Sequence, residues 1–466
     1  MRKWVIVLIA GVIATATSVA RPAAGVKPSS LVILYTSGAR GQIRSCNCSK
    51  FRFGGYGREL TLLKSIRAQC RDTVLLEGGD ITSEGGFQAE LKANVAATAL
   101  KKLGYAAMVP GETDLGIGGA NFINHFDSVP ILCANAPSIK RSKPYTIVKT
   151  ANGLRVGIIG LLDDNISREL ARVGGHLEVS DPAAAARSCV SKLKGKADII
   201  VVIYHGDDKS ASELTGIKGV DLILCTHSGG RDIVFPEKGG NLVKSTVEKR
   251  GNVILVKSRT STNWSLGRID LQLTSARRIK SAQHSVRYLD RSYSEDPAMV
   301  KVYDAYNEKV TQGVLSASKK FKEKSETLLI KRGLNPDEIR KRVHRSPFAT
   351  AETCKACHAD IYENWSKSRH SHAMASLEKM GQSFDPECTS CHVTGASARN
   401  GFVNKKENPE LVNVQCEACH GPGHEHIKSP AANKFAKVDE QTCRACHTDE
   451  RSPDFDFDKS WGSIKH

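Results

Sequence analysis

Two periodicities of hydrophobic positions alternate along the first 290 residues. Short apolar runs, typical of buried strands, are separated by segments whose apolar positions recur every three or four residues, as in amphipathic helices. The pattern predicts strands at 30–35, 73–77, 106–109, 129–133, 155–161, 199–204, 220–225 and 253–256, and helices at 58–69, 88–103, 181–193 and 209–214. The repeated strand-then-helix order favours an α/β layered domain over residues 28–290.

Residues 294–345 have a different pattern, because they are polar, rich in lysine and short of glycine. Pro297 begins a stretch in which one apolar stripe follows a helical period, and Asn335-Pro336-Asp337 is typical of the start of another helix. We expect a helical connector that orients the domains on either side of it. A charged connector of this kind usually presents a solvated face and not a binding patch.

The N-terminus has the features of a secretory signal peptide. Arg2 and Lys3 precede an apolar run over 4–13, and small residues lead to Ala20. The apolar run is too short to be a convincing membrane span, and no other run in the sequence approaches the necessary length. We therefore expect residues 1–20 to be removed, and the mature protein to be periplasmic or extracellular without a transmembrane segment.

Four copies of the pentapeptide Cys-x-x-Cys-His dominate the last quarter of the 466 residues, and they begin roughly thirty residues apart. This is the attachment signature of a c-type haem. Two thiols three positions apart reach two vinyl groups on one edge of a porphyrin, and the adjacent histidine then lies beneath the iron. The motifs are Cys354, Cys357 and His358; Cys388, Cys391 and His392; Cys416, Cys419 and His420; and Cys443, Cys446 and His447.

A single such motif is also compatible with half of a zinc ribbon or with a thiol redox pair. Four copies, each with the histidine directly after the second cysteine, favour four haem c groups. We expect residues 347–466 to form a domain of short helices and long loops. Segments of about thirty residues cannot build an ordinary core, so the porphyrins would serve as the core.

The formal net charge of +18 is partly offset by the two propionates that each haem carries. The remainder favours partners with acidic surfaces, because charge steers association and does not set the fold. No recognition helix or aromatic-basic motif supports binding of nucleic acid. We expect other redox proteins with acidic docking surfaces as partners.

Residues 352–466 resemble the multihaem cytochrome c family that includes the tetrahaem electron acceptor of hydroxylamine oxidoreductase. The resemblance rests on the sequences around the first three Cys-x-x-Cys-His motifs, on Trp365 before His370-Ser371-His372-Ala373, and on the ending Ile464-Lys465-His466. It implies axial ligands on the side of each iron opposite the motif histidine. The residues assigned to that role are His370, His372, His426 and His466, with His424 as an alternative to His426. The sequence does not reveal which of them serves which haem, and one relative is thought to keep one haem five-coordinate.

The front domain resembles the calcineurin-like metallophosphoesterases, and in particular the catalytic domain of the 5'-nucleotidases, which implies a four-layer α/β sandwich. Gly78-Gly79-Asp80 matches the Gly-Asp motif, and His205 closes a strand as the family's lone histidine does. The other motifs are altered: 35–41 replaces Asp-x-His, 111–114 replaces Gly-Asn-His-Asp/Glu, and 226–229 replaces Gly-His-x-His.

The resemblance implies that one of the family's two metal sites is lost, because Gly38, Arg40 and Gly229 cannot serve as ligands. The second site keeps donors at four positions, where zinc, manganese or iron would suit two nitrogens and two carboxylates. These four candidate ligands are Asp80, Glu112, His205 and His227. The family's catalytic histidine is replaced by Thr113, so we expect little hydrolysis of phosphate esters.

Simpler roles for the same residues remain open. The pattern is equally compatible with His205 and His227 as polar residues at strand ends that form hydrogen bonds within the fold. It is also compatible with Asp80 and Glu112 as caps of the helices that follow them. Cys46 and Cys48 would either supply a replacement metal or redox centre or form a disulfide with a nearby cysteine. The six cysteines outside the motifs have no connectivity that the sequence reveals; they are Cys46, Cys48, Cys70, Cys133, Cys189 and Cys225.

The sequence therefore favours an exported tetrahaem electron carrier whose front domain docks a partner or binds a ligand without hydrolysing it. Two alternatives belong to other classes. One is a multihaem reductase of hydroxylamine or nitrogen oxides, with an open haem as its active site. The other is a haem-linked phosphohydrolase.

Overall fold

The structure is a computed structural model. It describes residues 30–45, 53–83, 87–116, 125–172, 175–226, 246–258, 263–338, 346–396, 398–435, 437–448, 451–452 and 455–466. Of the residues singled out from the sequence, Cys46, Cys48 and His227 lie outside these ranges, as does the signal peptide.

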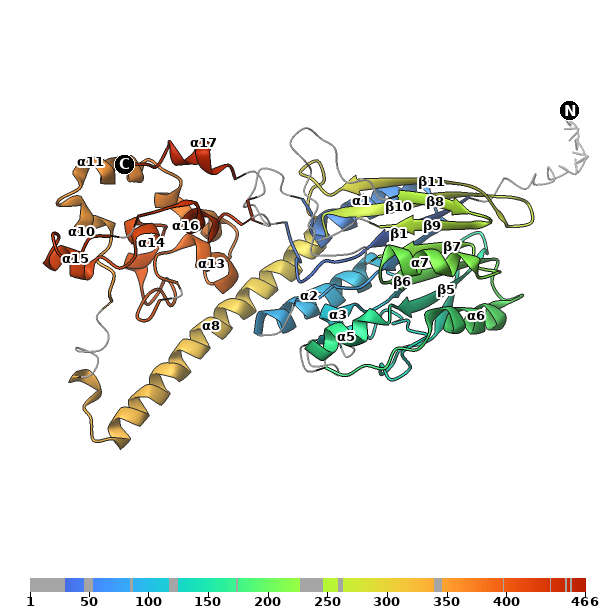
Figure 1. The fold of residues 1–466 in the computed structure, drawn as a ribbon, viewed down its shortest axis with the longest axis horizontal. Helices are drawn as coiled ribbons and strands as arrows, with labels where there is room; N and C mark the ends of the chain where they lie inside the picture. Colours follow the sequence, from blue (N-terminus) through green and yellow to red (C-terminus); the bar gives the residue numbers. More distant parts are fainter. Residues whose placement is uncertain are drawn as a thin grey trace, which may run out of the picture.

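Two mixed sheets form the centre of the front domain (Figure 1). The first sheet has the strand order β11-β10-β1-β2-β3. Its strands are β1 (Ser30–Thr36), β2 (Thr73–Glu77), β3 (Ala107–Met108), β10 (Ser265–Leu273) and β11 (Ile279–Tyr288). The second has the order β4-β5-β6-β7-β9-β8. Its strands are β4 (Tyr145–Lys149), β5 (Arg155–Leu162), β6 (Ile199–His205), β7 (Leu222–Cys225), β8 (Thr246–Arg250) and β9 (Val253–Lys257).

The central strands of the second sheet are buried on both faces, and their alternating side chains enter two different cores. Val201 and Ile203 of β6 belong to the large core between the sheets, whereas Val202 and Tyr204 pack into a smaller core on the opposite face. This alternation follows from the two-residue period of a strand. It explains why the strand reads as a continuous apolar run, as expected for a parallel strand covered on both sides.

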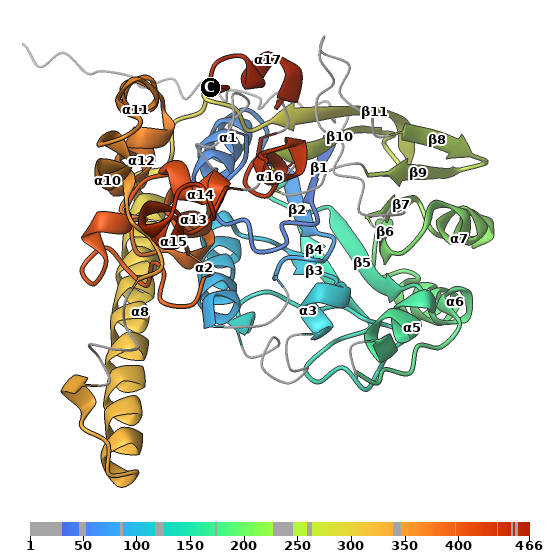
Figure 2. The same ribbon diagram turned by 60° about the vertical axis from the view of Figure 1, so that its left-hand side comes forward.

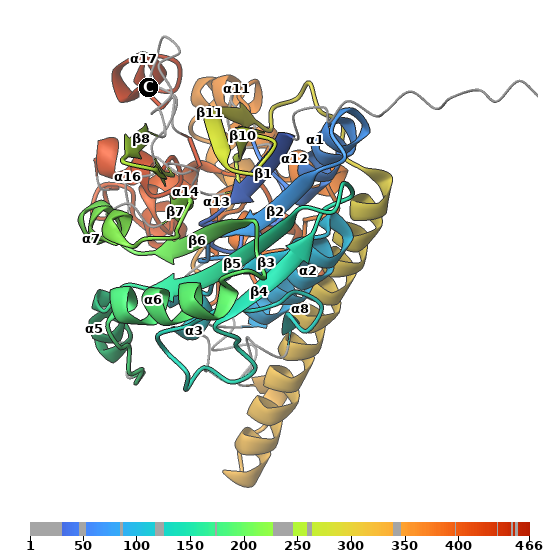
Figure 3. The ribbon, with the colours of Figure 1, turned by 90° about the vertical axis from the view of Figure 1, so that its right-hand side faces the viewer.

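Helices cover the outer faces and complete four layers (Figures 2 and 3). One outer layer contains α1 (Tyr56–Gln69), α2 (Phe87–Leu103) and the first turns of α8 (Pro297–Lys331). The other contains α6 (Pro182–Leu193) and α7 (Asp208–Glu213), followed by η1 (Leu214–Gly216). Two short helices lie at strand ends, α3 (Glu112–Gly116) and α5 (Asn165–Arg172).

The expected strand at 129–133 is not a strand but two isolated bridges, formed by Ile131 with Met108 and by Leu132 with Lys143. Pro130 explains the difference, because proline has no N–H to contribute to a ladder. Strands β4, β8, β10 and β11 were absent from the prediction. None of them is a continuous apolar run. Apolar and polar residues alternate along β10, and β4, β8 and β11 expose part of their length.

The connector begins with one long helix, α8, of 35 residues, and residues 336–338 are again helical, where the Asn335-Pro336-Asp337 sequence predicts the start of another helix. Asp296 caps it by accepting a hydrogen bond from the backbone N–H of Ala298 at 2.9 Å, and Pro297 occupies the first turn, where its missing N–H costs nothing. The predicted apolar stripe is buried against the front domain through Met299, Tyr303 and Tyr306.

The C-terminal segment consists of short helices and loops, as predicted (Figure 1). A small core of Phe348, Met374, Leu377, Phe402 and other apolar side chains holds part of it. Its helices are α10 (Ala351–Lys355), α11 (Ala359–Ser366), η2 (His370–His372), α12 (Ala373–Lys379), α13 (Pro386–His392), η3 (Pro409–Leu411), α14 (Cys416–His420), α15 (His424–Lys428), α16 (Glu440–Arg444) and α17 (Phe457–Trp461). None of the helices in the described part of the chain has the length and apolar character needed to cross a bilayer.

Polar contacts join this segment to α2 and α8. Gln88 donates a hydrogen bond to Asp385 at 2.7 Å, and Lys92 pairs with Glu387 at 2.5 Å. Farther along α8, Lys322 pairs with Glu407 at 2.7 Å. The front domain therefore contacts the residues that begin α13, the helix of the second Cys-x-x-Cys-His motif.

Candidate functional site

Asp80, Glu112 and His205 come together where strands of the two sheets end. Asp80 follows β2, Glu112 begins α3 just after β3, and His205 is the last residue of β6. One potential ligand atom from each lies within 4.8 Å of the others. Asp80 and His205 are buried and Glu112 is half-buried, so the three side chains form a compact set at the strand ends.

Glycines allow the loops that carry these residues to approach closely. Gly79 has a φ of +96°, and a Cβ there would lie 2.8 Å from Nδ1 of His205. A Cβ at Gly111 would lie 2.4 Å from Oδ1 of Asp80. Any side chain at either position would push the ligand set apart.

Asp114 fastens the two loops to each other. Its Oδ1 accepts hydrogen bonds from the backbone N–H groups of Ile81 and Thr82 at 2.8 and 2.9 Å, and its Oδ2 accepts from Gly111 at 2.9 Å. Burial, followed by the charge of Asp80, raises the pKa of Asp114 to about 7. Asp114 is thus a positioning residue that the sequence alone did not single out, although it lies in the Gly-Glu-Thr-Asp motif.

His205 is oriented for metal binding through Nε2. Its Nδ1 lies 2.6 Å from the carbonyl oxygen of Gly78, which accepts its proton, and its Nε2 lies 2.9 Å from Oε2 of Glu112. Burial alone lowers the pKa of His205, but the hydrogen bond with Glu112 and the charge of Asp80 outweigh it and raise the pKa to about 9. A backbone carbonyl that fixes the imidazole tautomer is a common arrangement behind a metal ligand.

The side of Asp80 that faces the lost metal site is occupied by Arg40. Nη2 of Arg40 lies 3.3 Å from Oδ2 of Asp80, and Nε2 of His205 lies 4.0 Å from the same oxygen. The other oxygen, Oδ1, accepts hydrogen bonds from the backbone N–H and the hydroxyl of Thr113, at 3.1 and 3.0 Å. A guanidinium therefore lies where the family resemblance places ligands of a first metal.

Two carboxylates and one imidazole fit a single divalent ion of the zinc, manganese or iron type, because these metals accept mixed oxygen and nitrogen donors. The predicted fourth ligand, His227, lies outside the described residues. The helix-cap interpretation explains only part of the geometry, since it does not bring Glu112 and His205 to 2.9 Å.

In the C-terminal segment, three motif histidines face a second histidine. The ring centroids are 6.3 Å apart for His358 and His426, 6.2 Å for His447 and His370, and 5.6 Å for His420 and His466. Two imidazoles bound to opposite sides of one metal ion, with bonds of about 2 Å, have centroids roughly 6 Å apart. The arrangement fits axial ligation of three haem irons.

The remaining nitrogen of several of these rings is held by the chain. Nδ1 of His426 donates to the carbonyl oxygen of Asn433 at 2.8 Å, and Nδ1 of His392 to that of Ala373 at 2.8 Å. Nδ1 of His447 lies 3.1 Å from the hydroxyl of Ser452. Such contacts orient each ring and leave Nε2 available to a metal.

His392, the remaining motif histidine, has no second histidine in ring contact among the residues that the structure describes. His372, the fourth predicted axial ligand, lies near the surface, where its Nδ1 is 2.7 Å from the hydroxyl of Ser371. The structure thus places three of the four predicted axial histidines beside a motif histidine but not His372, and axial ligation of the haems stays a prediction for all four.

The motif thiols lie close to one another across motifs. Cys354 lies near Cys416 and Cys391 lies near Cys446, close enough for each thiol to change the pKa of the other. The first and third attachment sites are therefore neighbours, as are the second and fourth. No pair of the described cysteines is joined in a disulfide, and Cys70, Cys133, Cys189 and Cys225 are thiols.

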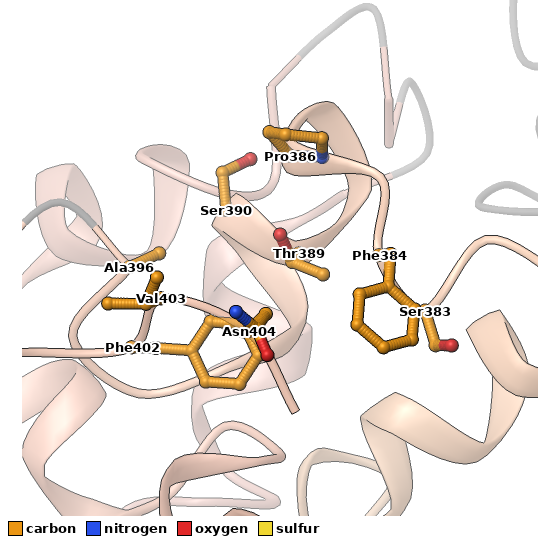
Figure 4. A pocket seen from close by; sticks show the side chains of 9 residues that line it. All are labelled: Ser383, Phe384, Pro386, Thr389, Ser390, Ala396, Phe402, Val403 and Asn404. Atoms are coloured by element: carbon orange, nitrogen blue, oxygen red, sulfur yellow. The ribbon is translucent and has the colours of Figure 1, made fainter. Parts of the chain in front are cut away.

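A cavity of about 240 Å³ lies beside α13 (Figure 4). Pro386, Thr389 and Ser390 of this helix line it together with Phe384 and Phe402. At 100° per residue these helix positions point away from Cys388, Cys391 and His392. The cavity is therefore separate from the face that would carry the haem.

Comparisons with known proteins agree with the division of the chain into a front domain and a C-terminal segment. The family described as cytochrome c554 and c-prime matches residues 353–421. Cytochrome c-554 of Nitrosomonas europaea is 31% identical over 143 residues, which cover 23% of this chain and 61% of that protein. A 5'-nucleotidase of Diplobatis ommata is 27% identical over 219 residues, covering 43% of this chain and 38% of that protein. The chain thus spans only part of the length of each of these relatives.

Among solved structures, the 5'-nucleotidase precursor of Thermus thermophilus superposes with a TM-score of 0.53 at 22% identity, covering 60% of this chain and 59% of that one. This likeness shows the fold of the front domain. The chain therefore joins a front domain that has the fold of a 5'-nucleotidase and is similar to 5'-nucleotidases in sequence to a C-terminal segment that matches the cytochrome c554 and c-prime family over residues 353–421.

Proposed function

We propose that this protein is an exported tetrahaem cytochrome that passes electrons between redox partner proteins. The observation that carries the proposal is the set of three imidazole pairs, each joining a motif histidine to a histidine distant in sequence. Bound haem supplies one-electron redox chemistry. Filling both axial positions with imidazole favours electron transfer over ligand binding.

The residues of the chain have two tasks in this function. The eight motif cysteines anchor the haems covalently, and the hydrogen bonds at Nδ1 keep the imidazole rings in place through oxidation and reduction. The first and third motifs lie near each other, as do the second and fourth, so the attachment sites within each of these two pairs are neighbours. Acidic surfaces on the partners would complement the excess of lysine and arginine.

The front domain, in this proposal, binds one divalent ion through Asp80, Glu112 and His205, with His227 as the expected fourth ligand, and hydrolyses phosphate esters poorly. Hydrolysis by two metals needs a pair of ions about 4 Å apart. Arg40 stands beside Asp80 in place of ligands for a second ion, and Thr113 replaces the catalytic histidine. The domain then serves to bind a ligand or dock a partner.

Intact mass and spectroscopy test the electron-carrier proposal. The protein purified from the periplasm or medium should lack residues 1–20 and should exceed the mass of the bare chain by four haems. Reduction should develop the absorption bands of low-spin c-type haem. A colourless protein, or one with the mass of the bare chain, would refute the proposal.

A second candidate is a reductase of hydroxylamine or nitrogen oxides, and it is favoured by one observation. His392 lacks a histidine in ring contact within the described residues, whereas the other three motif histidines have one. Cyanide and nitric oxide distinguish the two candidates. Spectra that neither ligand changes support the carrier, and catalytic consumption of hydroxylamine or nitrite at one haem supports the reductase.

The haem-linked phosphohydrolase is tested separately. We expect no release of phosphate from nucleotides or bis-phosphate esters when manganese or zinc is added. Turnover that is lost in the Asp80→Asn variant would instead establish the front domain as an enzyme.

A further inference from the structure

The far end of α8 exposes an unusual concentration of apolar side chains. Nine large hydrophobic side chains are exposed in the described part of the chain, and four of them fall within residues 321–334. They are Phe321 (70% exposed), Leu328 (50%), Ile330 (63%) and Leu334 (42%). Single exposed apolar residues are normal on protein surfaces, but a cluster of this kind marks an interaction site.

Part of this cluster continues the stripe that buries the first half of α8. Tyr303 and Val310 lie in the core of the front domain, and Val314 still packs against it. Phe321 and Leu328 follow Val314 at intervals of seven residues and therefore lie on the same face of the helix. Coverage by α2 ends near Gly313, where a Cβ would meet the ring of Phe87 at 2.2 Å.

Beyond the contacts that Ser318 and Lys322 make with Glu407, α8 projects away from the sheets and from the C-terminal segment (Figures 1 and 2). Its last turns present their side chains on several sides. Ile330 lies on a different face from Leu328, and Leu334 follows the end of the helix. The apolar residues thus surround a protruding tip and do not form a single flat face.

The turns just before the tip are strongly basic. Lysines stand at four of the six positions 319–324, and Lys331 and Arg332 lie at the end of the helix. Lys319 pairs with Glu323 at 3.9 Å and Lys322 with Glu407 at 2.7 Å, whereas Lys320 and Lys324 extend from the exposed surface. The lysines at 319, 320, 322 and 324 therefore form a basic collar over roughly half of the helix circumference, beside Phe321 and before the other apolar residues of the tip.

We propose that this tip docks the protein on an anionic lipid bilayer, with Phe321, Leu328, Ile330 and Leu334 in the interface and the lysine collar at the headgroups. Amphipathic helices that combine apolar anchors with lysine bind anionic bilayers in this manner without spanning them. The aliphatic stems of Lys331 and Arg332 reach the headgroups while their charges stay hydrated.

The charge pattern favours a bilayer over a second copy of the chain. Two tips that met face to face would bring their lysine collars together, and like charges at close range oppose association. An anionic surface complements both the collar and the charges of Lys331 and Arg332 at the end of the helix. The proposal concerns the attachment of the protein to a membrane surface, and it does not depend on the haems or on the candidate metal centre of the front domain.

Co-sedimentation of the full-length, haem-loaded protein with vesicles tests the proposal. We compare vesicles of phosphatidylglycerol and phosphatidylcholine in equal parts with vesicles of phosphatidylcholine alone. The variant Phe321→Glu/Leu328→Glu removes two anchors, and Ile147→Glu/Val247→Glu makes the same charge change at exposed apolar positions on two strands of the front domain. A third variant, Lys320→Gln/Lys324→Gln, reduces the collar. Haem absorption and circular dichroism verify that each variant is folded.

We expect binding to the anionic vesicles at least tenfold above that to neutral vesicles. The anchor variant should lose most of it, the control variant should keep it within about twofold, and the collar variant should lose about fivefold for each lysine. Binding that is equal on both vesicles, that is undetectable, or that survives the anchor substitutions would overturn the proposal. So would sedimentation velocity without lipid that shows a dimer dispersed by the anchor variant, because the tip would then be an interface between two copies.

Discussion

A buried glutamate in α1 should make the stability of the front domain fall as the pH rises. Glu59 is fully buried, and its Oε1 accepts a hydrogen bond from the hydroxyl of Tyr105 at 2.6 Å. Its Oε2 is buried without a hydrogen-bond partner among the described residues. Burial raises the pKa of Glu59 from 4.5 to about 7, against the opposing effect of the Tyr105 hydrogen bond.

The magnitude follows from the two pKa values. Because the folded-state pKa is raised, the contribution of Glu59 to stability is fully present below pH 4.5 and is lost as the pH rises to about 7 and beyond. A difference of about 2.5 pKa units corresponds to about 3 kcal/mol of unfolding free energy. The Glu59→Gln variant removes this dependence, so it should be more stable than the natural protein by up to about 3 kcal/mol at pH 8 and nearly equal to it at pH 4.

Guanidinium unfolding followed by the fluorescence of Trp264 measures this difference. Trp264 is the single tryptophan of the mature front domain, since Trp365 and Trp461 lie in the C-terminal segment, where haem quenches emission. Glu90→Gln, at an exposed position in α2, serves as the control and should leave the pH profile unchanged. A stability difference between Glu59→Gln and the natural protein that is constant from pH 4 to 8 would refute the argument.

Four further predictions concern the candidate sites and the fold. His426→Ala removes the partner of His358, so the low-spin electron paramagnetic resonance signal of one haem should become high-spin, while His176→Ala at an exposed position should change none. His205→Ala should reduce the bound metal of the front domain from near one per chain to a trace by elemental analysis, and His284→Ala, which removes a partner of Tyr35, should not. Gly267→Ala should lower the unfolding free energy by about 1–3 kcal/mol, because its Cβ would lie 2.1 Å from the ring of Tyr35, whereas Gly216→Ala meets nothing within 4 Å. A hydrogen bond from Arg155 holds the pKa of Asp198 well below its usual value, so stability should be lost as the pH falls below 3.8, and Asp198→Asn should abolish that loss in acid unfolding.

The sequence predicted those elements whose physical cause is local. The continuous apolar run of β6 and the periodic helix α2 agree with the structure to within a residue at each end. The edge strands were missed, because β11 has one neighbour and a largely polar sequence, and so its identity depends on β10. The pattern of residues 360–379 also predicts one continuous helix, whereas the structure divides them among α11, η2 and α12.

The same distinction applies to the sites. The haem motifs are local and were evident, as was the set Asp80, Glu112 and His205, through the family resemblance. The pairing of His358 with His426, by contrast, depends on loops that bring α10 near α15. Arg40 cannot bind a metal ion, but its contact with Asp80 places a positive charge beside the candidate metal centre. The sequence alone did not predict this contact.

The two halves of the chain are joined in a way that ties their sites together. Lys92 of α2 pairs with Glu387, which also lies 3.9 Å from Arg451 just after the fourth motif. Glu387 directly precedes Cys388, so one carboxylate links the front domain to the second and fourth attachment sites. These contacts are polar and few, and polar contacts hold an orientation better than they add stability. The long helix α8 therefore sets the orientation of the front domain relative to the C-terminal segment. It runs from the core of the front domain to the contact with Glu407 and on to the exposed apolar tip.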